Sequence, residues 1–145
     1  MSFKTAARYT LRTIQTLCGV AVFTNYVAEI RLSYGPSMVP TFSASPNLVL
    51  GECISPRLNP PNLRRGDIIT FLKPTQHSVS VCKRILAMPG DTISVDPLGG
   101  PGAPRVVIPA GHIWVQGDNP DHSLDSRAYG PVPMGLVKSR VVARA

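Results

Sequence analysis

Hydrophobic and polar positions follow a helical period at the start of the chain and a different pattern afterwards. In the first dozen residues, basic side chains recur every fourth position and apolar side chains fall on the opposite face of a helical wheel. The basic positions are Lys4, Arg8 and Arg12, and the apolar ones are Phe3, Ala7, Leu11 and Ile14. The stretch that follows, 13–28, has no charged side chain. We therefore predict one N-terminal helical segment over residues 1–30.

From Pro36 onward, short apolar runs alternate with turn residues, which is the pattern of an all-β domain. Clusters rich in proline, glycine and asparagine, at 59–62, 89–91 and 97–104, separate the runs. The predicted strands are 48–54, 68–72, 79–87, 92–95, 105–108, 112–116 and 136–143. The sequence thus predicts a mainly β domain over residues 31–145, preceded by one helix.

The predicted strand 79–87 carries a charge on an otherwise apolar face. Side chains alternate across a sheet, so one face holds Val79, Val81, Lys83, Ile85 and Ala87. Arg84 points the other way. An exposed lysine has a pKa of about 10.4, and burial lowers the pKa by as much as ~3–5 units. Buried, Lys83 would be a usable general base; the alternative is a lysine at the sheet margin whose amine reaches solvent.

Composition and charge narrow the function classes. The formal net charge is +7, from 15 lysines and arginines against 8 acidic residues. Basic residues in the β region are scattered and aromatic residues are few, which does not favour nucleic-acid binding. Cys18, Cys53 and Cys82 lack the CxxC spacing of zinc sites and are too few for a disulfide framework.

The basic, acid-free start of the chain is typical of a mitochondrial targeting segment. The uncharged stretch 13–28 would span roughly 24 Å as a helix, short of a hydrocarbon core of ~30 Å. A single span is feasible when Arg12 reaches outward and Glu29 lies at the far interface. We interpret the segment as an uncleaved membrane anchor; the alternatives are a cleavable signal peptide and a peripheral helix of a soluble domain.

Two loop segments carry candidate chemistry. Ser37 stands in a turn bounded by Gly35, Pro36 and Pro40. Such a turn can present a hydroxyl beside a backbone N–H, as a nucleophile with an oxyanion donor requires. The polar segment 117–130 is able to order itself through side-chain hydrogen bonds and an ion pair between acidic and basic side chains at 125 and 127. The plainer alternatives are an ordinary turn serine and a solvated loop.

In this order, the segments resemble the type I signal peptidases, which are membrane-anchored serine–lysine proteases with an antiparallel β catalytic core. The resemblance extends over about residues 29–142. Its motifs are Ser37-Met38-x-Pro40-Thr41, Arg65-Gly66-Asp67-Ile68, Lys83-Arg84-Ile85, Pro89-Gly90-Asp91, and Gly117-Asp118-Asn119 with Ser123-x-Asp125-Ser126-Arg127 and Gly130. Small size, Cys82 before Lys83 and the run 111–115 make the chain look most like the mitochondrial inner membrane peptidases. The ending Asp125-Ser126-Arg127 resembles their subunit 1 type.

The resemblance implies a role for each site residue. Ser37 would be the nucleophile, Lys83 the general base, and Ser123 the residue that orients the lysine. Asp125 and Arg127 would support the loop. No metal or organic cofactor is implied.

Two further residues bear on the cleft. The resemblance implies that Met38 lines the substrate cleft beside the nucleophile. Some bacterial members of the family carry a serine as an oxyanion donor two residues before the nucleophile, where this chain has Gly35. The oxyanion hole would then rest on backbone N–H groups, including that of Ser37.

The resemblance also implies an activity and a location. The chain would be an endopeptidase that removes sorting or signal sequences from proteins delivered to the mitochondrial intermembrane space. It would lie in the inner membrane with its catalytic domain facing that space, in a heteromer with a related second peptidase subunit. The alternatives are another type I signal peptidase and a catalytically inactive, membrane-tethered β binding subunit.

Overall fold

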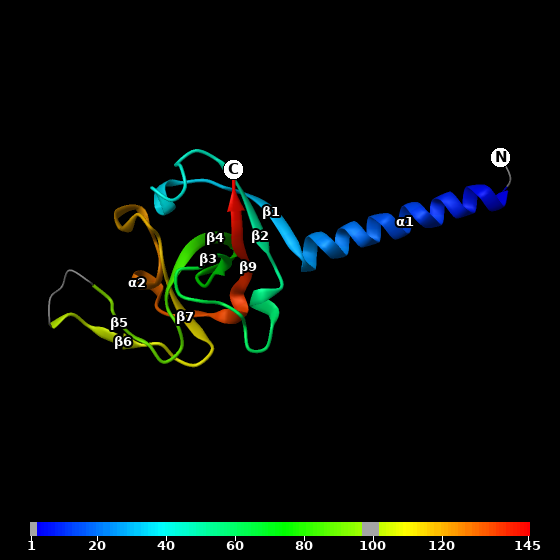
Figure 1. Ribbon diagram of the computed structural model, residues 1–145. Coiled ribbons are helices and arrows are strands. Elements are labelled where there is room, and N and C mark those ends of the chain that lie inside the picture. The colour runs from blue at the N-terminus through cyan, green and yellow to red at the C-terminus, as the bar shows by residue number, and fades with distance from the viewer. Residues whose placement is uncertain (1–2, 97–101) are drawn as a thin grey trace.

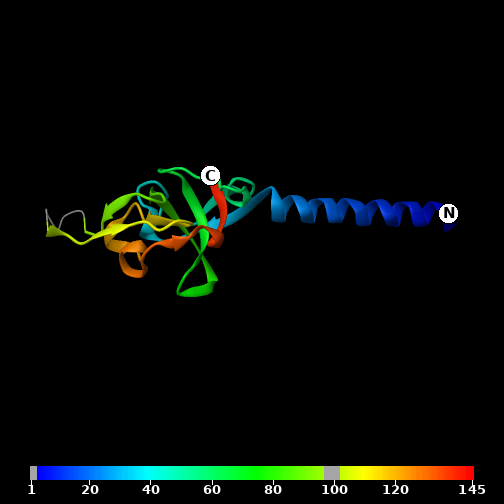
Figure 2. The same ribbon diagram turned by 90° about the horizontal axis from the view of Figure 1, so that it is seen from below.

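The computed structural model describes residues 3–96 and 102–145, with the backbone alone for Phe3, Lys4, Ala6 and His77 (Figure 1). Helix α1 (Phe3–Tyr26) extends away from a β domain as a single rod. A hairpin of two short strands extends from the opposite side of that domain, and the perpendicular view agrees (Figure 2). The predicted arrangement of one N-terminal helix followed by a mainly β domain is confirmed.

The strands form antiparallel pairs. They are β1 (Ala28–Ser33), β2 (Asn47–Glu52), β3 (Ile68–Lys73), β4 (Gln76–Ala87), β5 (Thr92–Ser94), β6 (Arg105–Val107), β7 (His112–Gln116), β8 (Val132–Pro133) and β9 (Val137–Arg144). The main sheet has the order β1-β2-β9-β3-β4-β7-β8, while β5 and β6 form the separate hairpin. Helix α2 (Ser126–Tyr129) is one turn long. Strand β9 therefore lies between two strands, β2 and β3, that precede it by many residues.

The predicted strands are all present, and β7 has the predicted limits. Strands β1 and β8 were not predicted. A single residue, Val27, separates the end of α1 from the start of β1, and neither glycine nor proline marks the boundary. Residues 28–30, which we assigned to the helical segment, therefore lie in the sheet. Strand β8 is two residues long, too short for side-chain alternation to reveal it.

The junction between α1 and the β domain is held by Arg57 and by a backbone hydrogen bond. The guanidinium of Arg57 donates a hydrogen bond to the carbonyl oxygen of Asn25 at 2.8 Å and lies over the ring of Tyr26, 4.9 Å from its centroid. The N–H of Cys53 donates to the carbonyl oxygen of Val27 at 2.8 Å. These contacts fix the point where the helix ends and the sheet begins.

The surface of α1 is largely apolar and has little contact with the β domain. Its large apolar side chains are each more than half exposed. Thr13, Thr16 and Thr24 each donate their hydroxyl hydrogen to a backbone carbonyl oxygen four residues earlier. By mean hydropathy, none of the helices in the described ranges is both long and apolar enough to cross a membrane.

Besides a cluster of Ala87, Ile108 and Trp114, two other apolar clusters fill the β domain. The larger one comprises Leu63, Ile69, Phe71, Ile85, Ile113, Val115, Val132 and Val137. The smaller one comprises Met38, Phe42, Val49 and Cys82 and packs the segment after β1 against β2 and β4. The three cysteines are free thiols, and burial raises the pKa of Cys82 to about 12. Cys82 is thus a core residue rather than a reactive thiol.

The two sides of a cleft are formed by β1 and the first half of β4. Strand β1 is at the edge of the main sheet and pairs with β2 alone among the described strands. Strand β7 pairs with β4 from Arg84 to Ala87, so within the described ranges residues 76–83 of β4 pair on one side, with β3. The cleft has a volume of about 400 Å³. It is bordered by backbone edges that have hydrogen-bonding capacity to spare.

Candidate active site

Ser37 lies in a tight 3-10 turn, residues 36–38, at one end of the cleft. Gly35 enters the turn with a φ of 108°, in the left-handed region that favours glycine. Pro36 then occupies the first helical positions, where a missing N–H costs nothing. Met38 is 2% exposed and packs in the smaller apolar cluster. The buried side chain of Met38 therefore anchors the turn, while Ser37 is partly exposed and lines the cleft.

Asn119 ties this turn to the loop that follows β7. The N–H of Asn119 donates to the carbonyl oxygen of Ser37 at 3.0 Å. Its side-chain amide donates to the carbonyl oxygen of Pro36 at 3.1 Å. The backbone of the candidate nucleophile is thus fixed by a residue far away in the sequence.

Lys83 belongs to β4, which lies between β3 and β7 in the main sheet, and the residue is 4% exposed. It pairs with Ile69 of β3, and Ile85 on the same face is completely buried. The burial expected from strand alternation is confirmed, and the alternative of a solvent-reaching amine is not. Burial lowers the pKa of Lys83, an effect that the negative charge of Asp125 opposes in part. Lys83 also lines the cleft, as Ser37 does.

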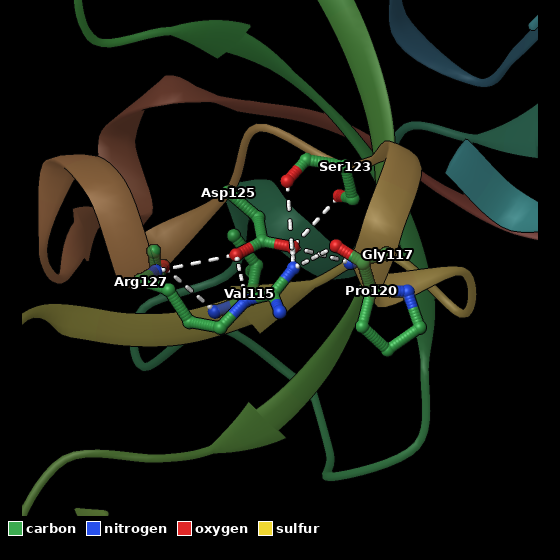
Figure 3. A network of polar contacts seen from close by, with 7 residues as sticks. Val115, Gly117, Pro120, Ser123, Asp125 and Arg127 are labelled. Carbon is green, nitrogen blue, oxygen red and sulfur yellow. Dashed lines mark hydrogen bonds and ion pairs between the residues drawn. The ribbon is translucent and has the colours of Figure 1, made fainter. Parts of the chain in front are cut away.

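Asp125 is the centre of a polar network in the loop after β7 (Figure 3). Its carboxylate accepts hydrogen bonds from the hydroxyl of Ser123 at 2.7 Å, the N–H of Gly117 at 3.0 Å, and Nε and Nη2 of Arg127 at 2.9 and 3.0 Å. Arg127 also donates to the carbonyl oxygen of Pro120 at 2.8 Å. Burial works to raise the pKa of Asp125, but these hydrogen bonds outweigh it and hold the pKa below its usual value. The expected Asp125–Arg127 ion pair is therefore present and orders the loop.

Gly117 lies where the three candidate segments meet. The pairing of Arg84 with Gln116 places Gly117 next in register, across from Lys83. A Cβ atom on Gly117 would lie closer than 3.0 Å to the carbonyl oxygen of Ser37 and to Oγ and Cβ of Ser123. The absent side chain therefore lets the turn of Ser37 and the hydroxyl of Ser123 approach the strand of the lysine.

We expect Gly117→Ala to cost roughly 100-fold in kcat/KM, because a side chain there displaces Ser37 relative to Lys83. Overpacking should also lower the free energy of unfolding by about 1–3 kcal/mol. Peptide cleavage and urea denaturation measure the two effects. Gly135→Ala is the matched control, since a Cβ there meets open space. Equal activities of the two variants would contradict the close-approach role of Gly117.

A second network joins the same segments on the opposite face of β4. Nε and Nη2 of Arg84 donate to the two carboxylate oxygens of Asp118 at 2.8 and 2.7 Å. The hydroxyl of Thr41 donates to Asp118 at 2.5 Å. Arg84, Asp118 and Thr41 all stand in the sequence motifs described above, but no role was predicted for them. The signal was available, because alternation puts Arg84 on the face opposite Lys83.

The structure brings the predicted site residues together in two layers. Ser37, Met38 and Lys83 line the cleft. Ser123, Asp125 and Arg127 are not among the described lining residues and belong to the loop network. In the described ranges, no three His, Cys, Asp or Glu side chains gather as they would around a metal ion.

Comparison with known proteins gives a consistent result. The family model described as "Signal peptidase, peptidase S26" matches residues 6–99 and 97–145. A Schizosaccharomyces pombe protein named mitochondrial inner membrane protease subunit 1 is 42% identical over 137 residues, covering 94% of this chain and 85% of the relative. A Saccharomyces cerevisiae protein named mitochondrial inner membrane protease subunit 2 is 37% identical over 145 residues, covering 97% and 81%. A crystal structure of a signal peptidase I from Enterococcus faecalis V583 aligns with a TM-score of 0.46 and 22% identity, over 55% of this chain and 97% of that one.

Proposed function

Because this chain belongs to the signal peptidase family, peptidase S26, we propose that it is a serine endopeptidase with Ser37 as the nucleophile and Lys83 as the general base. One observation carries the proposal: a partly exposed serine in a tight turn and a lysine that is 4% exposed line the same cleft. Burial favours the neutral amine, whose lone pair can accept the proton of a serine hydroxyl.

The reaction proceeds in two steps. Oγ of Ser37 attacks the carbonyl carbon of the scissile peptide bond as its proton passes to Nζ of Lys83, and that proton then goes to the departing amine. Water, deprotonated by the neutral lysine, hydrolyses the acyl-enzyme ester. The N–H of Ser37 is in the first turn of the 3-10 helix, where backbone N–H groups lack an intrahelical partner. It is the donor that we assign to the oxyanion.

Ser123 is proposed to orient the lysine. Its hydroxyl hydrogen is committed to Asp125, so the oxygen keeps its lone pairs for an N–H donor. An N–H of Lys83 donating to that oxygen would turn the nitrogen lone pair toward Ser37. The close approach of Ser123 and of the Ser37 backbone to Gly117 supports this arrangement. Asp125 and Arg127 act indirectly, because Asp125 holds the hydroxyl of Ser123 and Arg127 holds Asp125.

The substrate is proposed to be an extended polypeptide, the sorting or signal sequence of a protein delivered to the mitochondrial intermembrane space. The cleft lies between two strand edges with free hydrogen-bonding groups, which suits a peptide in β conformation. Relatives named mitochondrial inner membrane protease support the location of these substrates.

Helix α1 is proposed to attach the enzyme to the inner membrane, with the catalytic domain in the intermembrane space. Its exposed apolar side chains support this role. So do the internal hydrogen bonds of its threonines, because a hydroxyl already bonded to the backbone costs less to place in an apolar medium. Basic residues near its start favour the matrix side for that end.

A heteromer with a related second peptidase subunit is also proposed. Both subunit 1 and subunit 2 of the mitochondrial inner membrane protease are relatives of this chain at 37–42% identity. Affinity purification of the tagged chain from solubilised mitochondria tests this, with a second S26 peptidase as the expected partner.

The test of the reaction is cleavage of a precursor protein by the detergent-solubilised full chain. A precursor that carries an intermembrane-space sorting signal should yield one shortened product, with a new N-terminus that mass spectrometry identifies. A matrix-targeted precursor without such a signal should stay intact. Failure to cleave the first precursor, even with the second subunit present, would contradict the peptidase assignment.

We expect added protease to digest the catalytic domain in mitoplasts, whose outer membrane is opened, but not in intact mitochondria. The reason is that the proposed orientation exposes this domain once the outer membrane is breached. Immunoblotting with an epitope tag after Ala145 measures the protection. A matrix protein serves as the control for an intact inner membrane. Protection of the tag in mitoplasts would overturn the orientation.

A further inference from the structure

An arginine lies on the inner face of β1, the edge strand of the cleft. Arg31 pairs with Val49, whose side chain is 2% exposed and faces the core, so Arg31 points to the same side of the sheet. Its neighbours Ile30 and Leu32 point outward and are 72% and 66% exposed. The pattern reverses the usual one, in which the charge faces out and the aliphatic residues face in. Arg31 also lines the cleft that contains Ser37 and Lys83.

The guanidinium of Arg31 is held in place by Glu29. Nε of Arg31 contacts Oε2 of Glu29 at 2.9 Å. The other carboxylate oxygen of Glu29 is within hydrogen-bonding distance of the hydroxyls of Ser139, at 2.6 Å, and Thr70, at 3.0 Å. Ser139 and Thr70 are buried, and they are hydrogen-bonded to each other at 2.6 Å. The carboxylate that orients the arginine is therefore itself immobilised by two strands of the main sheet.

This arrangement leaves the cationic end of the pair accessible. The side chain of Arg31 is 46% exposed, whereas that of Glu29 is 15% exposed. Nε contacts Glu29, and the end of the planar guanidinium that its two terminal nitrogens form carries a further pair of N–H groups. These N–H groups form the fork that matches a carboxylate. A substrate at this end of the cleft thus meets donors and positive charge.

The position of Arg31 along β1 gives the distance from the scissile bond. Arg31 is four positions before Gly35, which enters the turn that carries Ser37. At ~3.3 Å per residue, four residues of extended chain span roughly 13 Å. An extended substrate has the same rise per residue. The substrate residue beside Arg31 is therefore about three to five residues from the scissile bond.

Resting on the proposed peptidase activity, we propose that Arg31 is a specificity residue that binds the carboxylate of an aspartate or glutamate in the substrate. Glu29 is its positioning residue, held in turn by Ser139 and Thr70. The same guanidinium fork could bind the phosphate of an anionic lipid. The substrate is favoured because Arg31 shares one continuous cleft with Ser37 and Lys83.

The experiment uses the full chain in detergent and peptides that span the cleavage site of a processed precursor. Sets of three peptides carry Asp, Asn or Lys at one position, scanned over three to five residues on each side of the scissile bond. For wild type we expect kcat/KM to favour Asp over Lys by roughly tenfold at one position, the effect of one charge-assisted hydrogen bond. Arg31→Gln should remove this preference and leave cleavage of the Asn peptide within about twofold of wild type.

Arg65→Gln is the matched control. Arg65 also forms an ion pair, with Asp91, but is not among the described residues of the cleft lining. It should keep the wild-type preference, which separates a local contact from a general loss of positive charge. Equal slowing of the Asp, Asn and Lys peptides by Arg31→Gln would overturn the proposal and leave Arg31 a structural partner of Glu29.

Two other results would also overturn the proposal. A preference that survives in Arg31→Gln excludes Arg31 as its source. A variant that keeps the preference but loses binding to phosphatidylcholine vesicles containing phosphatidylglycerol would assign Arg31 to lipid. If wild type cleaves the Asn peptide and Ser37→Ala does not, the peptidase assignment is supported independently of the result for Arg31. If wild type cleaves no peptide, the proposed function and the role of Arg31 fail together.

Discussion

Ser37→Ala should reduce cleavage of a sorting-signal precursor by roughly 10⁴-fold or more, because no other group can form the acyl-enzyme. The fold should survive. Ser37 is partly exposed, and its contacts to Asn119 are made by its backbone, which alanine retains. The free energy of unfolding should therefore stay within about 0.5 kcal/mol of wild type. Single-turnover cleavage assays and urea denaturation measure the two quantities.

The control for this variant is Ser94→Ala, in strand β5 of the separate hairpin. Ser94 bonds to the carbonyl oxygen of Asp96 and is not among the described residues of the cleft lining. It should cleave at the wild-type rate. If Ser37→Ala also did so, the nucleophile would have to be sought elsewhere, and the serine–lysine mechanism would be wrong.

Lys83→Met should be as inactive as the serine variant, and at least as stable as wild type. The two side chains have similar length, but methionine removes an amine that is 4% exposed. The cost of keeping that amine away from water disappears, and the attraction to Asp125 is lost in exchange. We expect the free energy of unfolding at neutral pH to be equal to that of wild type or higher by about 1–3 kcal/mol.

The pH dependence of wild type provides the independent evidence for this lysine. Burial lowers the pKa of Lys83 in the folded state, so between that pKa and the unfolded value of about 10.4 the unfolded chain binds more protons. Stability should therefore rise with pH through this window, and activity should rise as the neutral base accumulates. Lys83→Met should lack this part of the stability increase.

The matched control is Lys73→Met, at the end of β3, which should retain both activity and the pH dependence of stability. A stability curve of Lys83→Met that rises with pH as wild type does would show that another group titrates. An activity limb with the pKa of an exposed lysine would contradict a buried base.

Much of the β domain and the burial of Lys83 could be predicted from local patterns. Alternation within one strand is enough to put Lys83 on the apolar face, and Gly35 with Pro36 is enough to predict a turn at Ser37. These features depend on neighbours in the sequence. For the same reason the helix and the limits of β7 followed from periodicity and from turn residues.

Other features depend on contacts between distant segments, which one sequence does not display. The carboxylate of Asp125 accepts from Gly117 and Ser123, yet nothing local indicates which oxygen each will use. The close approach at Gly117 is visible after β4 and β7 have been paired. Strand β1 was missed because a single residue, Val27, joins it to α1 and neither glycine nor proline marks the boundary. The inward position of Arg31 was missed for the same reason.

The position of β9 in the sheet has a consequence for how the enzyme is made. Ser37 follows β1 and packs beside β2, whereas Lys83 belongs to the β3–β4 pair, and β9 joins these two halves. A ribosome delivers β9 after every other strand described in the sheet. We therefore expect Ser37 and Lys83, the proposed nucleophile and base, to reach their final arrangement when β9 pairs with both halves of the sheet.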